Sequence, residues 1–333
     1  MKTQEIQRIA CLGTGVIGAS WCTNFVMKGY EAVLYDISDE QLASGRQKVA
    51  DNLAFLVEKA CMTREAAGQA LDRVRCTTSM EEALCGVQLV QESVPERYEI
   101  KQAVLAQVDE FAGDRVIYAS STSGLLISEI AKLSQYPERC IGAHPYNPPH
   151  LIPLVELVGP AGSEAAVETA RQFYTQLGKE PVVLHQEVPG FIANRIQTAV
   201  AREIIDLVVR GVCSVEDADK ALTFGPGIRW AIMGQNLLYQ LGNPKGIKGL
   251  YANVGGGKNK KSWLEDMARW TTYPEDWPDM AQAGVEEAMA RRPAQLGNTN
   301  ESLARYRDEM LLEILKLHHK LGTQKQTGRC CGK

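Results

Sequence analysis

One short loop constrains the fold of this chain more than any other feature. The run GTGVIG at 13–18 matches the pattern GxGxxG, and it lies between a strand-like segment, 6–13, and a helix-like run, ASWCTNFVMKG. In such a context the first glycine permits a tight turn, the second lets a pyrophosphate approach the backbone, and the third lets helix and strand pack closely. The N–H groups and the dipole at the helix start attract the same anion. We therefore expect a dinucleotide site rather than a plain glycine turn, formed by Gly13, Gly15, Val16, Ile17 and Gly18.

Asp36 ends the next strand-like segment, EAVLYD, at the spacing expected for an acid that binds the adenosine ribose. A carboxylate there accepts a hydrogen bond from the 2′-hydroxyl of NAD and repels the 2′-phosphate of NADP. No arginine follows at once, because the next residues are Ile37, Ser38 and Asp39. An acid at a helix N-terminus is the alternative reading of Asp36, but its place at a strand end favours ribose binding and hence NAD as the cofactor.

Strand-like and helix-like segments alternate through the first half of the chain, which is typical of a doubly wound, mostly parallel sheet. Helical patterns occupy 40–60, 99–111, 125–134 and 163–178. The expected strands are 6–13, 31–36, 74–78, 87–93, 115–120, 140–146, 154–159 and 181–185.

The pattern changes after Pro189, and no strand is expected beyond that point. Apolar residues recur at helical spacing through 190–211, and Ser214 is a candidate N-cap for the next helix, with Asp217 at the box position. The sequence predicts an α/β protein with two domains, an NAD-binding Rossmann-type domain at 1–188 and an all-α domain at 189–333. Further helices are expected at 215–223, 262–270, 279–291 and 301–321.

Composition excludes several classes of protein. The chain has 333 residues, 45% of them hydrophobic, and a net charge of −4, so nucleic acid is not an expected partner. No apolar run approaches the roughly 20 residues of a membrane span, and the N-terminus has no signal-peptide pattern. Nine cysteines occur without a CxxC pair, which predicts no metal site and fits a reducing compartment, the cytoplasm. The pair Cys330-Cys331 is read as part of an unstructured terminus.

Three segments carry polar side chains next to expected strands: YASSTSG at 118–124, AHPYNPPHLIPLVEL at 143–157 and PGFIANR at 189–195. Ligands of doubly wound sheets bind at the carboxyl ends of strands, so a set of Ser, His, Asn and Glu there predicts an active site. Together with GTGVIGASW, these motifs resemble the 3-hydroxyacyl-CoA dehydrogenase superfamily over nearly the whole chain to about residue 235. Within it they are most similar to the branch that holds lambda-crystallin (L-gulonate 3-dehydrogenase) and L-carnitine dehydrogenase.

The resemblance implies roles for particular residues. His144 is the expected general base and Glu156 its partner. This suits the chemistry, because an imidazole takes the proton of a hydroxyl as hydride leaves the carbon, and a carboxylate on the other ring nitrogen fixes the tautomer. Ser123 and Asn194 are the expected ligands of the substrate oxygen, and Asn147 is expected to orient the site.

Glu96 and Lys101 resemble the family residues that contact the nicotinamide-side ribose, and a solvated helix start is their alternative reading. The run SSTS at 120–123 departs from the SNTS of many acyl-CoA members and is shared with the lambda-crystallin branch. The expected helix at 40–60 also lacks the lysine-rich character that helps acyl-CoA members to hold CoA phosphates.

The segment GPGIRWAIMG at 225–234 suggests how a substrate acid is bound. Arg229 is proposed to bind its carboxylate through the planar guanidinium, and a surface ion pair is the alternative. The stretch at 251–263 is glycine- and lysine-rich without P-loop spacing, and its role stays open.

The sequence thus predicts an NAD-dependent oxidoreductase that acts on the 3-hydroxyl of a small free acid, as a homodimer like the family. An acyl-CoA substrate is the alternative enzyme, and a structural crystallin-like protein is the alternative of another class.

Overall fold

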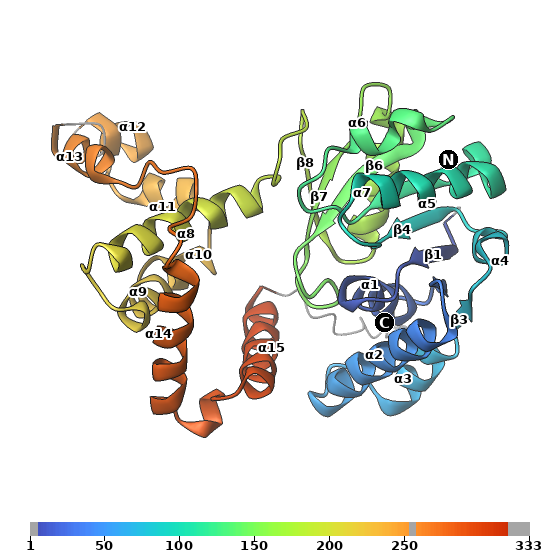
Figure 1. Cartoon of the computed structure of the whole chain (residues 1–333), viewed down its shortest axis with the longest axis horizontal. Helices are drawn as coiled ribbons and strands as arrows, with labels where there is room; N and C mark the ends of the chain where they lie inside the picture. The colour runs from blue at the N-terminus through green and yellow to red at the C-terminus, as the bar shows by residue number, and fades with distance from the viewer. Residues whose placement is uncertain (1–5, 253–257, 319–333) are drawn as a thin grey trace, which may run out of the picture. The chain divides into compact units, whose positions relative to one another are not determined.

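The computed structural model describes residues 6–252 and 258–318 (Figure 1). They divide into two compact units, one that ends at Asn194 and one that comprises Arg195–His318. The division falls within a helix, just after the predicted domain boundary at 188–189. The pair Cys330-Cys331 and part of the 251–263 stretch lie outside the described residues.

The first unit is built on one eight-stranded sheet with the order β3-β2-β1-β4-β5-β6-β7-β8. All neighbours are parallel except β6 and β7, which run antiparallel. The order reverses between β2-β1 and β1-β4, which creates the crevice where doubly wound sheets bind nucleotides. The predicted α/β fold with a mostly parallel sheet is confirmed. The strands are β1 Arg8–Leu12, β2 Glu31–Tyr35, β3 Val74–Thr77, β4 Leu89–Glu92, β5 Ile117–Ser120, β6 Cys140–Pro145, β7 Leu154–Val158 and β8 Glu180–Val183.

Apolar clusters cover both faces of the sheet. Successive side chains of a strand point to opposite faces, so one strand contributes to both clusters. In β1, Ile9 and Cys11 pack into one apolar cluster, and Ala10 and Leu12 pack into another. The helices in between are α1 Val16–Met27, α2 Asp39–Glu58, α3 Arg64–Leu71, α4 Met80–Leu84, α5 Tyr98–Phe111, α6 Ile127–Ile130 and α7 Glu164–Gln176, with the short 3-10 turns η2 Gly113–Arg115, η3 Ala131–Leu133 and η4 Pro137–Arg139.

Several of these helices begin at a capping side chain. Ser38, Thr63 and Ser79 each accept a hydrogen bond from the backbone N–H three residues later. Such a cap contributes about 1 kcal/mol, so polar residues in the sequence fix where these helices start.

The described residues of the second unit form helices joined by turns and loops, and no strand follows β8 in the described part of the chain. Ser214 caps α9 as predicted, accepting from the backbone N–H of Asp217 at 3.1 Å. The helical conformation is interrupted after α9, where Gly225 has non-helical backbone angles and Pro226 follows it. The helices are α8 Ala193–Val209, α9 Val215–Leu222, α10 Ile228–Trp230, α11 Gln235–Leu241, α12 Gly246–Leu250, α13 Lys258–Asp266, α14 Trp277–Arg291 and α15 Asn300–Leu317, with η5 at Thr223–Gly227 and η7 at Ala294–Leu296.

Among the residues described, no helix combines the length and the apolar character needed to cross a membrane.

Candidate active site

Of the three glycines in the loop, Gly15 has room for a Cβ atom, whereas Gly13 and Gly18 do not. Gly13 has a φ of +91°, and a Cβ there would lie 2.7 Å from the carbonyl oxygen of Ser93. A Cβ on Gly18 would lie 1.9 Å from the carbonyl oxygen of Gly13, so this glycine lets α1 pack on β1. A Cβ on Gly15 would meet nothing within 4 Å, and Gly15 is the N-cap of α1. The residues present therefore fit a pyrophosphate at Gly15, next to Val16 and Ile17 at the helix start.

Asp36 lies at the end of β2 beside this loop. Its Oδ2 accepts hydrogen bonds from the backbone N–H of Thr14 at 2.8 Å and from the Thr14 hydroxyl at 2.7 Å. Its Oδ1 accepts from the backbone N–H of Ile37 at 2.8 Å. The carboxylate is thus fixed against the glycine loop, as the predicted contact with an adenosine ribose requires.

His144 and Glu156 face each other across the antiparallel pair β6 and β7, where they are register partners. His144 Nδ1 lies 2.8 Å from Glu156 Oε2, and both side chains are buried. The ring of Phe191 stacks on the imidazole with 4.8 Å between the ring centroids. The carboxylate and the phenyl ring together fix the orientation of the imidazole, which leaves Nε2 for the substrate.

Glu156 is held in its charged form by the start of α8. Its Oε1 accepts from the backbone N–H groups of Ile192 and Ala193 at 2.8 and 3.0 Å. Burial raises the pKa of this carboxyl, but the hydrogen bonds from His144, Ala193 and Ile192 lower it by more. The pKa of Glu156 therefore lies below its ordinary value. The buried anion is therefore available to stabilise an imidazolium at His144.

Asn194 and Ser123 lie next to the open side of this histidine. The Asn194 amide nitrogen lies 3.5 Å from His144 Nε2 and donates to the backbone oxygen of Ser123 at 3.3 Å. The side chain of Ser123 is exposed. The structure thus brings together four of the predicted residues, His144, Glu156, Ser123 and Asn194, all within the first unit.

Glu96 holds the loop that carries Ser123. Its Oε1 accepts from the Thr122 hydroxyl at 2.7 Å and from the backbone N–H groups of Ser123 and Gly124 at 2.8 and 3.0 Å. Burial raises the pKa of Glu96, but the hydrogen bond from Thr122 and the charge of Lys101 outweigh it and leave the pKa lowered. One carboxylate oxygen of Glu96 thus fixes the backbone of the loop that carries Ser123.

Lys101 lies deeper than its predicted contact with a ribose suggests. It is 1% exposed, and its Nζ lies 2.7 Å from Glu92 Oε1 and 3.3 Å from Glu96 Oε2. These contacts point to an indirect role, in which Lys101 orients Glu96.

Sequence reasoning missed Glu92. This fully buried carboxylate accepts from Lys101, from the backbone N–H of Val94, from the Tyr118 hydroxyl and from the Ser120 hydroxyl, at 2.6–3.0 Å. It fastens the end of β4 to the end of β5. The sequence signal that could have found it is an ionisable residue inside the strand-like segment VQLVQES.

The two remaining predicted substrate residues are exposed. Asn147 follows β6 in the first unit, and Arg229 lies in α10 of the second. The Arg229 side chain has no hydrogen-bond or ion-pair partner among residues 6–252 and 258–318.

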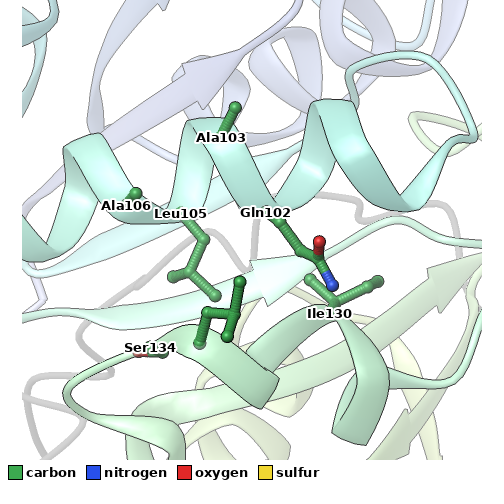
Figure 2. A pocket seen from close by; sticks show the side chains of 7 residues that line it. Gln102, Ala103, Leu105, Ala106, Ile130 and Ser134 are labelled. Atoms are coloured by element: carbon green, nitrogen blue, oxygen red, sulfur yellow. The ribbon is translucent and has the colours of Figure 1, made fainter.

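A cavity elsewhere in the first unit contains none of these residues. It encloses about 210 Å³ between α5 and the segment α6–η3 (Figure 2), and its lining is mainly apolar. The lining residues are Gln102, Ala103, Leu105, Ala106, Ile130, Leu133 and Ser134.

Comparison with known proteins agrees with this geometry. Residues 8–188 match the 3-hydroxyacyl-CoA dehydrogenase NAD binding domain, and residues 190–278 match the C-terminal domain of the same enzymes. The chain is 35% identical to L-carnitine dehydrogenase from Streptomyces coelicolor, over 97% of this chain and 98% of that one. It is also 35% identical to 3-hydroxyacyl-CoA dehydrogenase from Gibberella moniliformis, over 96% and 98%.

A solved structure is similar over the same extent. It is an NAD-dependent 5-formyl-3-hydroxy-2-methylpyridine 4-carboxylic acid 5-dehydrogenase, with a TM-score of 0.77 and 27% identity over 95% of this chain and 98% of that chain. The two matched domains, the full-length relatives and the geometry of the His144–Glu156 pair lead to one conclusion. The chain belongs to the 3-hydroxyacyl-CoA dehydrogenase family.

Proposed function

We propose that this chain is an NAD-dependent dehydrogenase that oxidises the 3-hydroxyl of a small free 3-hydroxy acid to a ketone. The observation that carries the proposal is the buried His144–Glu156 pair, whose open nitrogen Nε2 faces Asn194. NAD, bound at the glycine loop and Asp36, supplies the acceptor for the hydride. The names of the L-carnitine dehydrogenase relatives support a free hydroxy acid as the substrate.

The chain's own residues account for the movement of the proton. The substrate hydroxyl donates to His144 Nε2, and its proton moves to that nitrogen as the hydride leaves the carbon. The imidazolium that forms is stabilised by Glu156, whose other oxygen stays bound to the start of α8. Asn194 and the Ser123 hydroxyl donate to the oxygen that becomes the carbonyl, which lowers the barrier by placing donors where charge develops.

The contacts of α2 support a free acid over a CoA thioester. Arg46 donates to the backbone oxygen of Val74, Lys48 donates to the Ser44 hydroxyl, and Lys59 pairs with Glu58. These are the basic residues of the segment 40–60, and each already has a partner within its own unit. Glu40, Asp51 and Glu58 of the same segment balance these three positive charges, so the segment offers no net positive charge to the phosphates of CoA.

Arg229 is the proposed partner of the substrate carboxylate. It is exposed and unpaired within the described chain, and a guanidinium binds a carboxylate through two parallel hydrogen bonds. Arg229→Met is expected to raise KM for the free acid at least 10-fold with little change in kcat. The matched control is Arg210→Met, since Arg210 is exposed but already paired with Asp206 and Asp266. Equal KM values in the two variants would contradict this role.

We further propose that the second unit forms a homodimer interface. Its described surface carries large apolar side chains, including Phe224 at 73%, Leu241 at 73% and Trp263 at 65% exposure. A contiguous set of such residues commonly marks a contact with another protein. Light scattering of the purified chain checks this, and Phe224→Ser with Leu241→Ser is expected to weaken the dimer. A wild-type monomer at micromolar concentration would contradict it.

The proposed compartment is the cytoplasm. The seven described cysteines are free thiols, which supports a reducing environment.

A substrate screen tests the enzyme proposal. NADH absorbance is followed with L-carnitine, L-gulonate and 3-hydroxybutyrate and with 3-hydroxybutyryl-CoA, each with NAD and with NADP. The proposal predicts a free acid with NAD as the pair with the highest kcat/KM. A higher kcat/KM for the thioester would favour the acyl-CoA alternative, and no turnover of any of them in a folded, NAD-binding protein would favour a structural role.

A further inference from the structure

A buried lysine lies outside the catalytic set. Lys179 precedes β8 and is 4% exposed. Its Nζ donates to the backbone oxygen of Pro149 and, at 3.1 Å, to the backbone oxygen of Ile152. The same nitrogen lies 5.3 Å from the ring centroid of Trp21 in α1. The ammonium group thus joins three separate segments of the first unit.

This cation is buried without an anion. No carboxylate within the described residues forms an ion pair with Lys179, and its partners are two carbonyl dipoles and the face of an indole. A buried ammonium group is costly to desolvate, so its contacts must fix something that a neutral side chain would fix less well. What they fix is the segment 146–153, which we call the post-histidine loop because it follows β6 and His144.

A second contact ties the same loop to α1. The backbone N–H of His150 donates to Ser20 Oγ at 2.8 Å, and His150 Nδ1 lies 2.7 Å from that oxygen. Ser20 and Trp21 are consecutive residues of the helix that starts at the glycine loop. The post-histidine loop is therefore anchored at two points to the nucleotide-binding helix.

We propose that Lys179 is a positioning residue that holds the post-histidine loop, and with it Asn147, in place for the substrate. The proposal rests on the proposed function for its consequence in catalysis, because Asn147 is the loop residue expected to meet the substrate. The anchoring itself depends only on the contacts of Lys179.

The environment of the lysine makes this anchor sensitive to pH. Burial, with a smaller effect from Lys28 at the C-terminal end of α1, lowers the pKa of Lys179 to about 7. The other titratable groups of the segments around it are Tyr146 and His150 in the loop, Cys22 in α1, Glu180 next to the lysine, and Tyr174 in α7, whose backbone oxygen accepts from the Lys179 N–H. Below pH 7 the buried amine carries a charge that opening of the loop would return to water, whereas above pH 7 the closed loop holds a neutral amine without this cost.

Hydrogen exchange of the loop tests the anchoring without any substrate. The variants are Lys179→Met, which removes the donors, and Lys179→Gln, which keeps N–H donors without the charge. Lys28→Met is the matched control, since Lys28 is an exposed lysine just after α1 whose removal also deletes one positive charge nearby. We expect exchange of peptides that cover 146–153 to accelerate at least 10-fold in Lys179→Met, less in Lys179→Gln and not in Lys28→Met.

The pH dependence separates Lys179 from His150. After correction for intrinsic exchange rates, protection of the loop in the wild type is expected to rise as pH rises through 7, because the closed loop then holds the neutral amine. This rise should be absent in Lys179→Met and present in His150→Asn. If His150→Asn instead abolished it, the histidine would be the titrating group and the pH dependence assigned to Lys179 would be wrong.

Kinetics then test the consequence for the substrate. In Lys179→Met, KM for the free acid is expected to rise 5- to 20-fold, while the NAD affinity of the protein changes less than 2-fold. Unchanged loop exchange in a folded Lys179→Met protein would overturn the proposal. If instead the loop loosens but no free acid is turned over even by the wild type, the anchoring stands and the proposed function fails.

Discussion

The two units of this chain differ in how many of their large apolar side chains they bury. The first unit buries apolar side chains on both faces of its sheet, in two clusters. Its core also contains four fully buried aromatic residues, Trp21, Phe25, Phe173 and Tyr174. In the described second unit few apolar residues are buried, for example Ile205 and Leu312, while many large ones are exposed.

The same contrast holds for polar groups. Glu92, Glu96 and Glu156 each accept several hydrogen bonds inside the first unit. Arg229 in the second unit has no partner within the described residues. The difference teaches that the contacts among His144, Glu156, Ser123 and Asn194 are made by the first unit itself, whereas the roles proposed for the second unit depend on molecules outside the described chain.

The largest expected effect comes from breaking the glycine loop of the first unit. Gly18→Ala is expected to prevent folding or to destabilise the chain by several kcal/mol, because its Cβ would lie 1.9 Å from the Gly13 oxygen. Gly15→Ala, where a Cβ meets nothing within 4 Å, should keep its thermal stability and lose NAD affinity. Thermal unfolding and NAD titration measure both. If Gly15→Ala bound NAD like the wild type, the pyrophosphate would not lie at Gly15.

The carboxylate behind the histidine is the next test. Glu156→Gln is expected to lower kcat on the order of 10²–10⁴-fold, because a neutral amide no longer stabilises the imidazolium. Steady-state kinetics measure this, and far-ultraviolet circular dichroism checks folding. The matched control is Glu168→Gln, an exposed glutamate of α7 paired with Arg171. A fall in kcat of less than 5-fold in Glu156→Gln would remove the carboxylate from the proton transfer.

Asp36 gives a smaller effect on cofactor choice. Asp36→Ser is expected to weaken NAD binding about 10- to 100-fold and to narrow the preference over NADP, since the hydroxyl no longer repels a 2′-phosphate. Fluorescence titration with both cofactors measures this. An unchanged NAD to NADP ratio of affinities would show that Asp36 does not face the ribose.

The smallest effect concerns stability against pH at Lys179. The pKa of this lysine is lowered from 10.5 to about 7 in the folded chain. Below pH 7 both states hold the proton and the cost of the buried charge is fully present, whereas above pH 7 the folded state releases it first. The unfolding free energy of the wild type should therefore rise with pH relative to Lys179→Met, by about 2 kcal/mol between pH 7 and pH 8.5. Urea unfolding of both proteins measures this, and parallel pH curves would contradict the lowered pKa.

Much of the fold was predictable because it follows from local patterns. Each expected strand of the first half is present within a few residues, since alternating apolar segments and capping residues such as Ser38 and Ser214 act locally. The antiparallel pairing of β6 and β7 was not predicted, because strand direction depends on how a connection folds back.

The site was predictable only in part, for a physical reason. His144, Glu156 and Asn194 follow motifs of a known family, but their roles stay predictions until they are tested. Glu92 and Lys179 were missed because their importance comes from burial, and burial depends on what other segments cover them. A charged residue within or beside an apolar strand is the one local sign of such a group.

The proposed chemistry depends most on transfer of the hydroxyl proton to His144. The most direct measurement is the single-turnover rate of NADH formation by His144→Gln and wild type, both saturated with NAD and with the best substrate of the screen. We predict a rate on the order of 10²–10⁴-fold lower in the variant, with unchanged NAD affinity. A rate within 5-fold of the wild type would contradict the role of His144 as the base.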